Sequence, residues 1–211
     1  MIRLRDLAFT AADTGCRLLT GIDLEVSAGE CLGVLGPSGS GKSTLGYHLC
    51  GIHRKALLGT TTGVLELNGR DCRDRDLPGF AGVVLQNPVG QLFCRTPREE
   101  IALGPENQGL APAAVAARTA TLLHAWGLDH VADRPSATLS HGMKQRLSIA
   151  AMLAIDPRVL LLDEPTSFLD PPTADRLFDL LTRRSRQEGT TVVVIDHDRT
   201  RLLPWSDRVI Q

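Results

Sequence analysis

The feature that most constrains this chain is a glycine-rich loop between an apolar run and a helical segment. Residues 36–44 satisfy the pattern GxxxxGK[ST]. Its three glycines allow the backbone to curl, so that successive N–H groups point inward and form an anion nest at a helix N-terminus. The pattern therefore predicts a phosphate-binding site made of Gly36, Pro37, Ser38, Gly39, Ser40, Gly41, Lys42, Ser43 and Thr44.

Two side chains of this loop and two acidic residues further on predict the chemistry of a nucleotide. Lys42 is expected to reach the β and γ phosphates, and the Ser43 hydroxyl is expected to bind Mg²⁺. The run at 159–162 ends in Asp163, which places a carboxylate at the carboxyl end of a buried strand, where Mg²⁺ needs a ligand or an outer partner. Glu164 points elsewhere on the next peptide, toward a water in line with the γ phosphate, and is the candidate general base or water-orienting group.

Runs that are apolar on both faces predict buried strands at 31–35, 82–85, 159–162 and 191–195. They alternate with helical segments near 42–50 and 173–187, a pattern that indicates a parallel sheet covered on both sides. Polar and apolar residues alternate at 2–7 and 22–26, which favours half-solvated antiparallel strands. The segment 63–69 predicts a short strand that ends in an Asn-Gly turn.

From residue 87 to about residue 140, Pro and Gly punctuate the chain and apolar strand runs are missing, while 113–126 has helical periodicity. We interpret this region as an inserted helical lobe. The predicted organisation is one domain over 1–211, in which 1–88 and 151–211 form a core with a small antiparallel lobe and 89–150 form the helical lobe.

Composition excludes several classes of protein. The formal net charge of −1 gives no global attraction to nucleic acid, so no nucleic-acid partner is expected. No apolar run approaches the ~18 residues that span a bilayer, and the polar N-terminus is not that of a signal peptide. The cysteines are odd in number and lack metal-ligand spacing, which favours reduced thiols; they are Cys16, Cys31, Cys50, Cys72 and Cys94.

Further motifs follow in a specific order. Gln86 ends an earlier strand, residues 139–146 precede the Asp163–Glu164 strand, residues 167–170 follow it, and His197 comes after the last strong strand. In this order they resemble the nucleotide-binding subunit of ATP-binding-cassette (ABC) proteins over essentially the whole chain. The resemblance implies an α/β fold with a RecA-like P-loop core, a small antiparallel β subdomain and a helical subdomain.

The resemblance also implies roles for individual residues. Gln86 is expected to contact Mg²⁺ and water and to link to a transmembrane partner, and His197 to contact the γ phosphate. Ser140 and Gly142 belong to a signature helix whose N-terminus suits a γ phosphate bound to the opposite protomer, so that ATP joins two head-to-tail subunits. Asp170 is expected at the seam of that dimer.

Two positions depart from the family pattern. The signature reads Ser-His-Gly-Met where the family usually has Ser-Gly-Gly-Gln, so the imidazole of His141 replaces a small residue and predicts reduced hydrolysis at the site that this signature completes. Family members generally stack an aromatic side chain on adenine. Here Ala11 falls at that place and Phe9 is expected to pack under the sheet, which predicts loose nucleotide selectivity.

The segments 86–93 and 101–107 resemble the cobalt and energy-coupling-factor (ECF) group of uptake ATPases. In that group a short helix contacts coupling helices of a membrane scaffold, and Gln91, Leu92 and Phe93 are expected on it; alternatively, Leu92 and Phe93 seal the helical lobe. Members usually carry a C-terminal extension, whereas 208–211 fall within the expected final strands, so this sequence is either trimmed or a minimal version.

The resemblance implies an ATPase that binds ATP and Mg²⁺ and powers import of a vitamin or metal ion. Its expected partners are an identical or homologous ATPase subunit and integral membrane scaffold and substrate-binding subunits, at the cytoplasmic face of the cell membrane. Another ABC importer class and a free-standing regulatory ATPase remain alternatives. A non-hydrolytic binding module would be expected to lack Glu164 or His197, and both are present.

Overall fold

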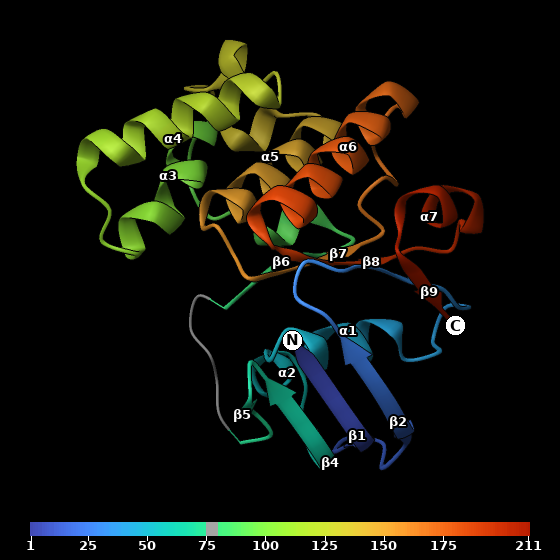
Figure 1. The fold of residues 1–211 in the computed structure, drawn as a ribbon. Coiled ribbons are helices and arrows are strands. Elements are labelled where there is room, and N and C mark those ends of the chain that lie inside the picture. Colours follow the sequence, from blue (N-terminus) through green and yellow to red (C-terminus); the bar gives the residue numbers. More distant parts are fainter. Residues whose placement is uncertain (75–79) are drawn as a thin grey trace.

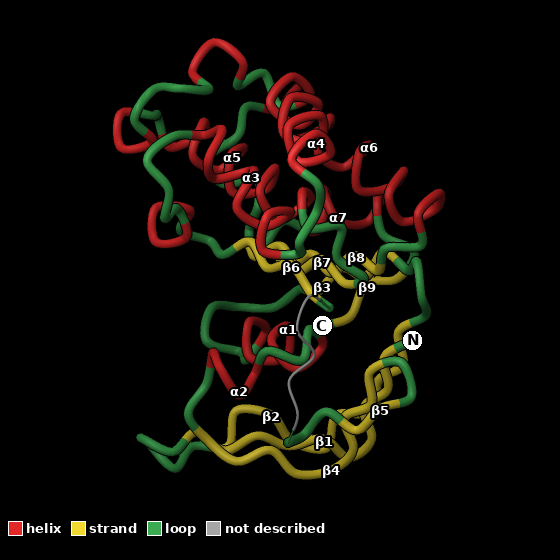
Figure 2. Tube along the Cα trace, turned by 90° about the vertical axis from the view of Figure 1, so that its left-hand side faces the viewer, coloured by secondary structure: helices red, strands yellow, loops and turns green. Residues whose placement is uncertain are grey.

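The computed structural model describes residues 1–74 and 80–211, and it contains two separate sheets (Figure 1). A five-stranded sheet has the order β6-β7-β8-β3-β9, and a four-stranded sheet has the order β2-β1-β4-β5. The helices α1 and α2 lie between the two sheets, whereas the longer helices cover the opposite face of the five-stranded sheet (Figure 2).

The five-stranded sheet is parallel, as the apolar runs predicted. All residues of its strands β3 and β8 are buried, which is why these strands carry no alternation of polar and apolar residues. In register, Val34 pairs with Ile195, and Asp163 also pairs with Ile195. The strands are β3 (Cys31–Val34), β6 (Ala81–Val84), β7 (Val159–Asp163), β8 (Thr191–Ile195) and β9 (Arg208–Ile210).

The four-stranded sheet is antiparallel and has one solvated face. Asn68 and Gly69 both have positive φ, 51° and 73°, and make the tight turn that the sequence predicted. Phe9 is buried between this sheet and α1, which confirms the prediction that it packs under the sheet. The strands are β1 (Ile2–Ala11), β2 (Arg17–Val26), β4 (Gly59–Leu67) and β5 (Arg70–Asp71).

Helix α1 (Lys42–Leu49) is fixed against both sheets. A Cβ atom at Gly46 would come within 2.9 Å of the Leu161 side chain, so glycine lets the helix approach the parallel sheet closely. On the opposite side, His48 is fully buried; its Nδ1 lies 2.7 Å from the Thr44 carbonyl and its Nε2 lies 3.0 Å from the Thr61 hydroxyl of β4. Because a carbonyl can only accept, Nδ1 carries the proton and Nε2 accepts from Thr61.

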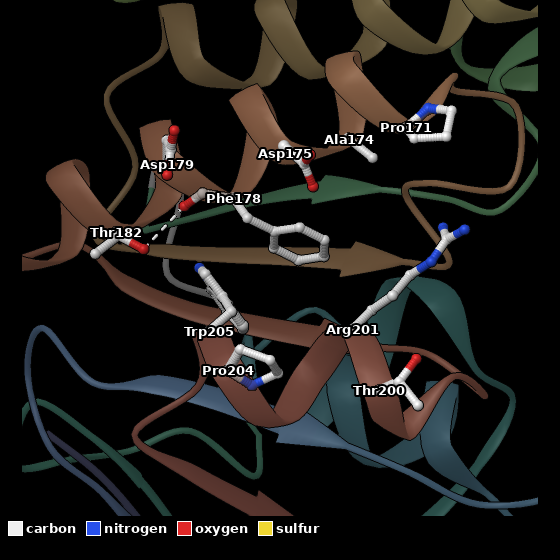
Figure 3. Close-up of a pocket in the computed structure, with 10 residues that line it drawn as sticks. All are labelled: Pro171, Ala174, Asp175, Phe178, Asp179, Thr182, Thr200, Arg201, Pro204 and Trp205. Carbon is white, nitrogen blue, oxygen red and sulfur yellow. Dashed lines mark hydrogen bonds between the residues drawn. The ribbon is translucent and has the colours of Figure 1, made fainter.

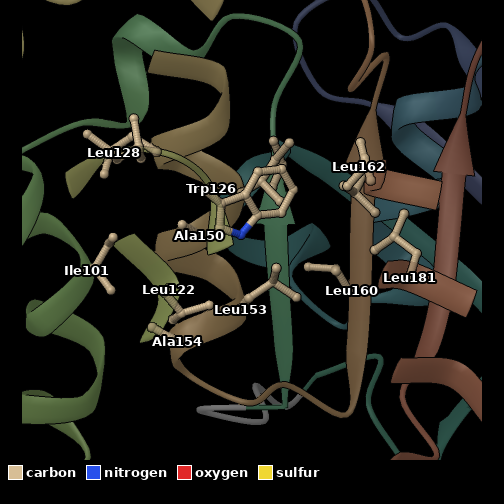
Figure 4. Close-up of a cluster of buried hydrophobic side chains, with 14 of the residues drawn as sticks. Ile101, Leu122, Trp126, Leu128, Ala150, Leu153, Ala154, Leu160, Leu162 and Leu181 are labelled. Atoms are coloured by element: carbon tan, nitrogen blue, oxygen red, sulfur yellow. The ribbon is translucent and has the colours of Figure 1, made fainter. Parts of the chain in front are cut away.

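The remaining helices build a second core on the other face of the parallel sheet. There Trp126, Leu128 and Leu153 pack with Leu160 and Leu162 of β7 (Figure 4). Thr96 and Glu99 form a capping box that starts α3. The helices of this face are α3 (Pro97–Asn107), α4 (Pro112–Ala125), α5 (His141–Ala154), α6 (Pro171–Glu188) and α7 (Arg199–Trp205), with short 3₁₀ turns at Pro88–Gln91 (η1), Asp129–Val131 and Ser136–Thr138. The short helix α2 (His53–Ala56) lies with α1 between the two sheets.

The division into lobes stays a prediction. Helix α5 continues to Ala154, past the predicted border at residue 150, and it packs against both β6 and α3. Across residues 1–74 and 80–211, no helix has the length and apolarity needed to cross a membrane.

Candidate functional site

The glycine-rich loop connects β3 to the start of α1, at the carboxyl end of the parallel sheet. Gly41, with φ 90°, is the residue before the helix, and a Cβ atom there would lie 2.9 Å from the Leu18 carbonyl oxygen. Both the backbone angle and the close approach therefore require glycine. Lys42 Nζ donates to the carbonyl oxygens of Gly36 and Pro37, each at 2.8 Å, so the ammonium group lies across the loop.

Ser43 and Asp163 meet at the base of this loop. The Ser43 hydroxyl donates to Asp163 Oδ2 at 2.6 Å, which joins the first turn of α1 to the end of β7. Burial raises the pKa of Asp163, and the negative charge of Glu164 adds to this effect, while the hydrogen bond from Ser43 opposes it. The arrangement places two oxygen groups side by side where a cation can be held.

Glu164 lies at the centre of a second group of side chains. It has the uncommon φ of 47°, and its backbone N–H donates to the Ile195 carbonyl at 2.8 Å. Its carboxylate accepts a hydrogen bond from Gln86 Nε2 at 2.9 Å, and its other oxygen lies 3.6 Å from His197 Nδ1. The structure thus brings together Gln86, Glu164 and His197 from three different segments.

His197 and Glu164 differ in exposure, which determines what each can contact. The His197 side chain is 71% exposed, whereas that of Glu164 is 19% exposed. His197 Nδ1 faces carboxylate oxygens of Glu164 and Asp196, both at 3.6 Å, so the outer nitrogen Nε2 is the one directed to solvent and to a ligand. Sequence reasoning did not single out Asp196; a carboxylate directly before the histidine is the only signal that could have found it.

Ser140, Gly142 and Asp170 lie together in a different place. The Ser140 hydroxyl caps α5 by accepting from the Met143 N–H at 3.3 Å. The Asp170 carboxylate caps α6 by accepting from the N–H and hydroxyl of Thr173, at 3.0 and 2.9 Å, and these bonds lower its pKa. Within the described parts of the chain, no hydrogen bond joins these residues to residues 36–44.

The N-terminus of α5 packs on the segment that follows Glu164. A Cβ atom at Gly142 would lie 2.8 Å from the Phe168 carbonyl oxygen, so the absence of a side chain permits this approach. The His141 ring rests on the Phe168 ring, with centroids 5.4 Å apart and planes tilted by 38°. The imidazole is therefore supported by an aromatic side chain of its own chain.

The segment after Gln86 corrects one expectation. The turn η1 ends at Gln91, and Leu92 is extended, with φ −90° and ψ 119°, so the prediction that Leu92 and Phe93 lie on a short helix is wrong. The physical reason is the Gln91 side chain, which accepts from the Leu85 N–H at 2.7 Å and donates to the Val83 carbonyl at 2.8 Å. These bonds hold Gln91 against β6 and end the turn.

Leu92 and Phe93 have opposite environments. Leu92 packs against the core of the helical region, whereas Phe93 is 81% exposed. The buried carboxylate of Glu100 in α3 accepts the backbone N–H groups of Phe93 and Cys94, at 2.9 and 2.7 Å. This fixes the backbone so that the Phe93 side chain projects into solvent, and only Leu92 seals the helical lobe.

Two cavities flank the site. One, of about 410 Å³, lies beside the glycine-rich loop, and its described wall contains no aromatic side chain; it includes Leu19, Ile22, Leu35, Pro37, Lys42 and Ile210. The other, of about 430 Å³, lies between α6 and α7, where Phe178 and Trp205 face each other and Arg201 lines the opposite end (Figure 3).

The fold and the loop define a class of protein. The loop follows a strand of the parallel sheet and begins a helix, and a carboxylate from another strand of that sheet lies on the loop serine. This is the arrangement of a P-loop nucleoside triphosphatase. Residues 19–167 match the ABC transporter family. The chain belongs to this family, and it is an ATPase of the ABC type, with the fold class that the sequence predicted.

The chain is similar to "Energy-coupling factor transporter ATP-binding protein EcfA" of Methanothermobacter thermautotrophicus, with 41% identity over 99% of this chain and 67% of the relative. It is similar in structure to cbiO1 from Clostridium perfringens, described as part of the ABC transporter complex cbiONQ, with 29% identity, a TM-score of 0.79 and coverage of 100% and 86%. It is also similar to a dimeric post-hydrolysis state of the ATP-binding cassette MJ0796 bound to ADP and Pi, with 26% identity, a TM-score of 0.86 and coverage of 100% and 93%. The chain spans between 38% and 68% of the length of four of its curated relatives.

Proposed function

We propose that this chain hydrolyses MgATP to power import of a small solute, of the vitamin or metal-ion class, through a separate ECF-type membrane complex. The observation that carries the proposal is the contact of Glu164 with Gln86 and His197, next to the Ser43–Asp163 pair at the phosphate loop. The names of the relatives, an energy-coupling factor transporter protein and a part of the cbiONQ complex, support the transporter type.

The oxygen groups at the loop fit Mg²⁺. Ser43 offers a hydroxyl and Asp163 a carboxylate, and because the Gln86 amide nitrogen donates to Glu164, its amide oxygen is the group left for a cation. Residues 1–74 and 80–211 contain no cluster of three or more His, Cys, Asp or Glu side chains placed to hold a metal. Mg²⁺ in nucleotide sites uses few protein ligands together with phosphate oxygens and water, and it would neutralise charge on the phosphates.

The protein groups then divide the remaining work. The loop N–H groups of residues 38–41 and the Lys42 ammonium bind the phosphates, once Lys42 exchanges its two carbonyl partners for phosphate oxygens. Glu164 accepts a proton from the attacking water or orients it, and Gln86 holds the Glu164 carboxylate in place. His197 contacts the γ phosphate through Nε2, because Nδ1 faces carboxylates.

The signature residues act on a second subunit. Ser140, Gly142 and Asp170 lie on a surface that no described hydrogen bond connects to the loop of the same chain, so in this proposal they complete the site of a partner ATPase. The dimeric state of MJ0796 supports this arrangement. Two head-to-tail copies, or this chain with a homologue, then enclose ATP between one loop and the opposite α5 N-terminus.

Contact with a membrane subunit is assigned to the exposed surface around Phe93. Phe93 is 81% exposed and Val89, on η1, is 46% exposed, and both follow Gln86 closely. A hydrophobic side chain whose backbone is fixed by Glu100 is a suitable anchor for a partner helix. This would place the chain at the cytoplasmic face of the membrane through its partner.

The proposal is tested by expressing the tagged chain with the membrane proteins encoded beside it and isolating the complex in detergent. We expect a multi-span scaffold and a small substrate-binding membrane protein to co-purify with wild type, and Phe93→Ser to lose them while it still binds ATP. Leu58→Ser is the matched control, because Leu58 is 82% exposed but lies beside the antiparallel sheet. Recovery of an ATPase without any membrane protein would instead indicate a free-standing regulatory ATPase.

A further inference from the structure

Gln91 carries a side-chain amide that pairs with the outer edge of the parallel sheet. Strand β6 is the outermost strand on one side of that sheet, so among the described residues no further strand covers its outer N–H and C=O groups. Gln91 Oε1 accepts from the Leu85 N–H at 2.7 Å, and Gln91 Nε2 donates to the Val83 carbonyl at 2.8 Å. Because an N–H only donates and a carbonyl only accepts, these two partners fix the orientation of the amide.

The two partners have the spacing that a neighbouring parallel strand would use. In a parallel pair, one residue of the neighbour donates to the carbonyl of residue i and accepts from the N–H of residue i+2. Val83 and Leu85 have this spacing, so one primary amide replaces one residue of a neighbouring strand. Strand β6 ends at Val84, and the bond to Leu85 therefore extends the pairing of this edge to the residue directly before Gln86.

The same bonds close the loop that carries Gln86. The Gln91 side chain ties the end of the segment 85–91 to its start, and within the segment Asn87 Oδ1 accepts from the Val89 N–H at 3.0 Å. Gln86 is exposed and donates from Nε2 to Glu164 at 2.9 Å. A closed loop has fewer conformations than an open one, so less entropy is lost when the Gln86 amide is held against Glu164.

We propose that Gln91 is a positioning residue for ATP hydrolysis, whose amide completes the edge of β6 and thereby holds Gln86 where it contacts Glu164. The inference rests on the proposed function in the role given to Gln86. It requires a primary amide, because one group has to accept from the backbone N–H and donate to the backbone carbonyl. A side chain without these atoms leaves the phosphate loop intact but releases Gln86, so turnover slows while ATP binding is kept.

The experiment compares wild type with Gln91→Met, which keeps the length of the side chain without its polar atoms, in two measurements. The first is hydrogen exchange of the Leu85 amide, followed by NMR without nucleotide, and we expect exchange at least about tenfold faster in the variant. The second is steady-state hydrolysis of MgATP, for which we expect kcat to fall roughly five- to thirtyfold with KM within about threefold of wild type.

A double-mutant cycle with Gln86→Ala tests whether Gln91 acts through Gln86. If it does, Gln91→Met lowers kcat by less than about twofold further once the Gln86 amide is already gone. A residue that only supports the fold would instead lower kcat by the same factor in both backgrounds.

Two further variants keep the test decisive. Gln91→Glu can still accept from the Leu85 N–H but cannot donate to the Val83 carbonyl, so it should show a smaller form of both effects even if Gln91→Met folds poorly. Gln108→Met is the matched control. Gln108, at the end of α3, donates from Nε2 to the Ile155 carbonyl at 2.7 Å, so this variant also removes a side-chain bond to the backbone, and it should change neither measurement.

Unchanged exchange of the Leu85 amide in Gln91→Met would overturn the proposal, because the side chain would then not hold the edge of β6. Faster exchange with an unchanged kcat, or an equal fall of kcat in both backgrounds, would overturn the link to Gln86. If Gln86→Ala hydrolyses ATP at the wild-type rate, the role of Gln86 in the proposed function fails and the link to hydrolysis fails with it. The exchange measurement still decides on its own whether Gln91 closes the loop.

Discussion

The hydroxyl of Ser43 donates a 2.6 Å hydrogen bond to the carboxylate of Asp163, across 120 positions of sequence. The bond joins the first turn of α1 to the end of β7. It therefore fixes the phosphate loop relative to Glu164, which directly follows Asp163. In the proposed function, a shift of the loop on nucleotide binding therefore also shifts Glu164, the residue that accepts a proton from the attacking water or orients it.

Lys42→Ala is expected to abolish nucleotide binding at ordinary ATP concentrations, because it removes the cation that the phosphates would pair with. We expect the affinity to fall by roughly a hundredfold or more, which corresponds to about 3 kcal/mol. Titration with a fluorescent ATP analogue measures this. Lys55→Ala, at an exposed lysine of α2, is the control, and near-normal affinity of Lys42→Ala would contradict the assignment of the loop.

Glu164→Gln is expected to bind ATP and to lose hydrolysis by roughly a hundredfold or more, since an amide cannot accept the proton of water. The glutamine oxygen can still accept the hydrogen bond from Gln86, so the site should keep its shape. Size-exclusion chromatography with light scattering should show an ATP-dependent dimer that persists. Hydrolysis at the wild-type rate would move the role of base to another residue.

His141→Gly is expected to raise the rate of ATP hydrolysis several-fold, because it removes an imidazole from the N-terminus that is proposed to meet the partner's phosphates. The ring rests on Phe168, so Phe168→Ala should leave the imidazole in place but without support, and we expect it not to raise the rate. Steady-state ATPase assays compare the two variants. An identical rate in His141→Gly and wild type would show that the histidine in the signature does not slow ATP hydrolysis.

Acid is expected to destabilise the fold through His48. Burial lowers the pKa of His48 from 6.5 to about 4, so between these values the unfolded chain binds a proton that the folded chain does not. Stability therefore falls as the pH drops from 7 toward 4, and at pH 4.5 this residue alone accounts for about 2–3 kcal/mol. Urea unfolding at pH 7 and at pH 4.5 measures this loss of unfolding free energy. The loss should be smaller in His48→Gln than in wild type, and it should be unchanged in His124→Gln, where the side chain is exposed.

Local patterns were sufficient for most of the fold. The parallel strands were predictable because both of their faces are buried, which leaves continuous apolar runs such as 191–195. The loop at 36–44 was predictable because phosphate binding requires glycines and a lysine at a fixed spacing, and this spacing is visible in the sequence. The order of motifs allowed the family to be inferred, since each motif follows a strand or begins a helix.

Other features depend on contacts between distant residues and left no pattern. Gln91 ends its turn because its side chain reaches back to β6, and nothing near Leu92 in the sequence signals this. The same holds for Asp196, whose partner Thr166 lies on a different loop. The positive φ of Glu164 also follows from the tertiary structure, because its N–H must reach the Ile195 carbonyl.

Strand β3, which carries the phosphate loop, is flanked by β8 and β9, and both are encoded far later in the chain. During synthesis on the ribosome, residues 36–44 therefore emerge long before the strands that hold β3 in place. A nascent chain that stops short of β8 lacks the neighbours of β3, and contacts so distant in sequence form late and slowly. Competence to bind nucleotide is thus a property that the growing polypeptide acquires only near the end of translation of this domain.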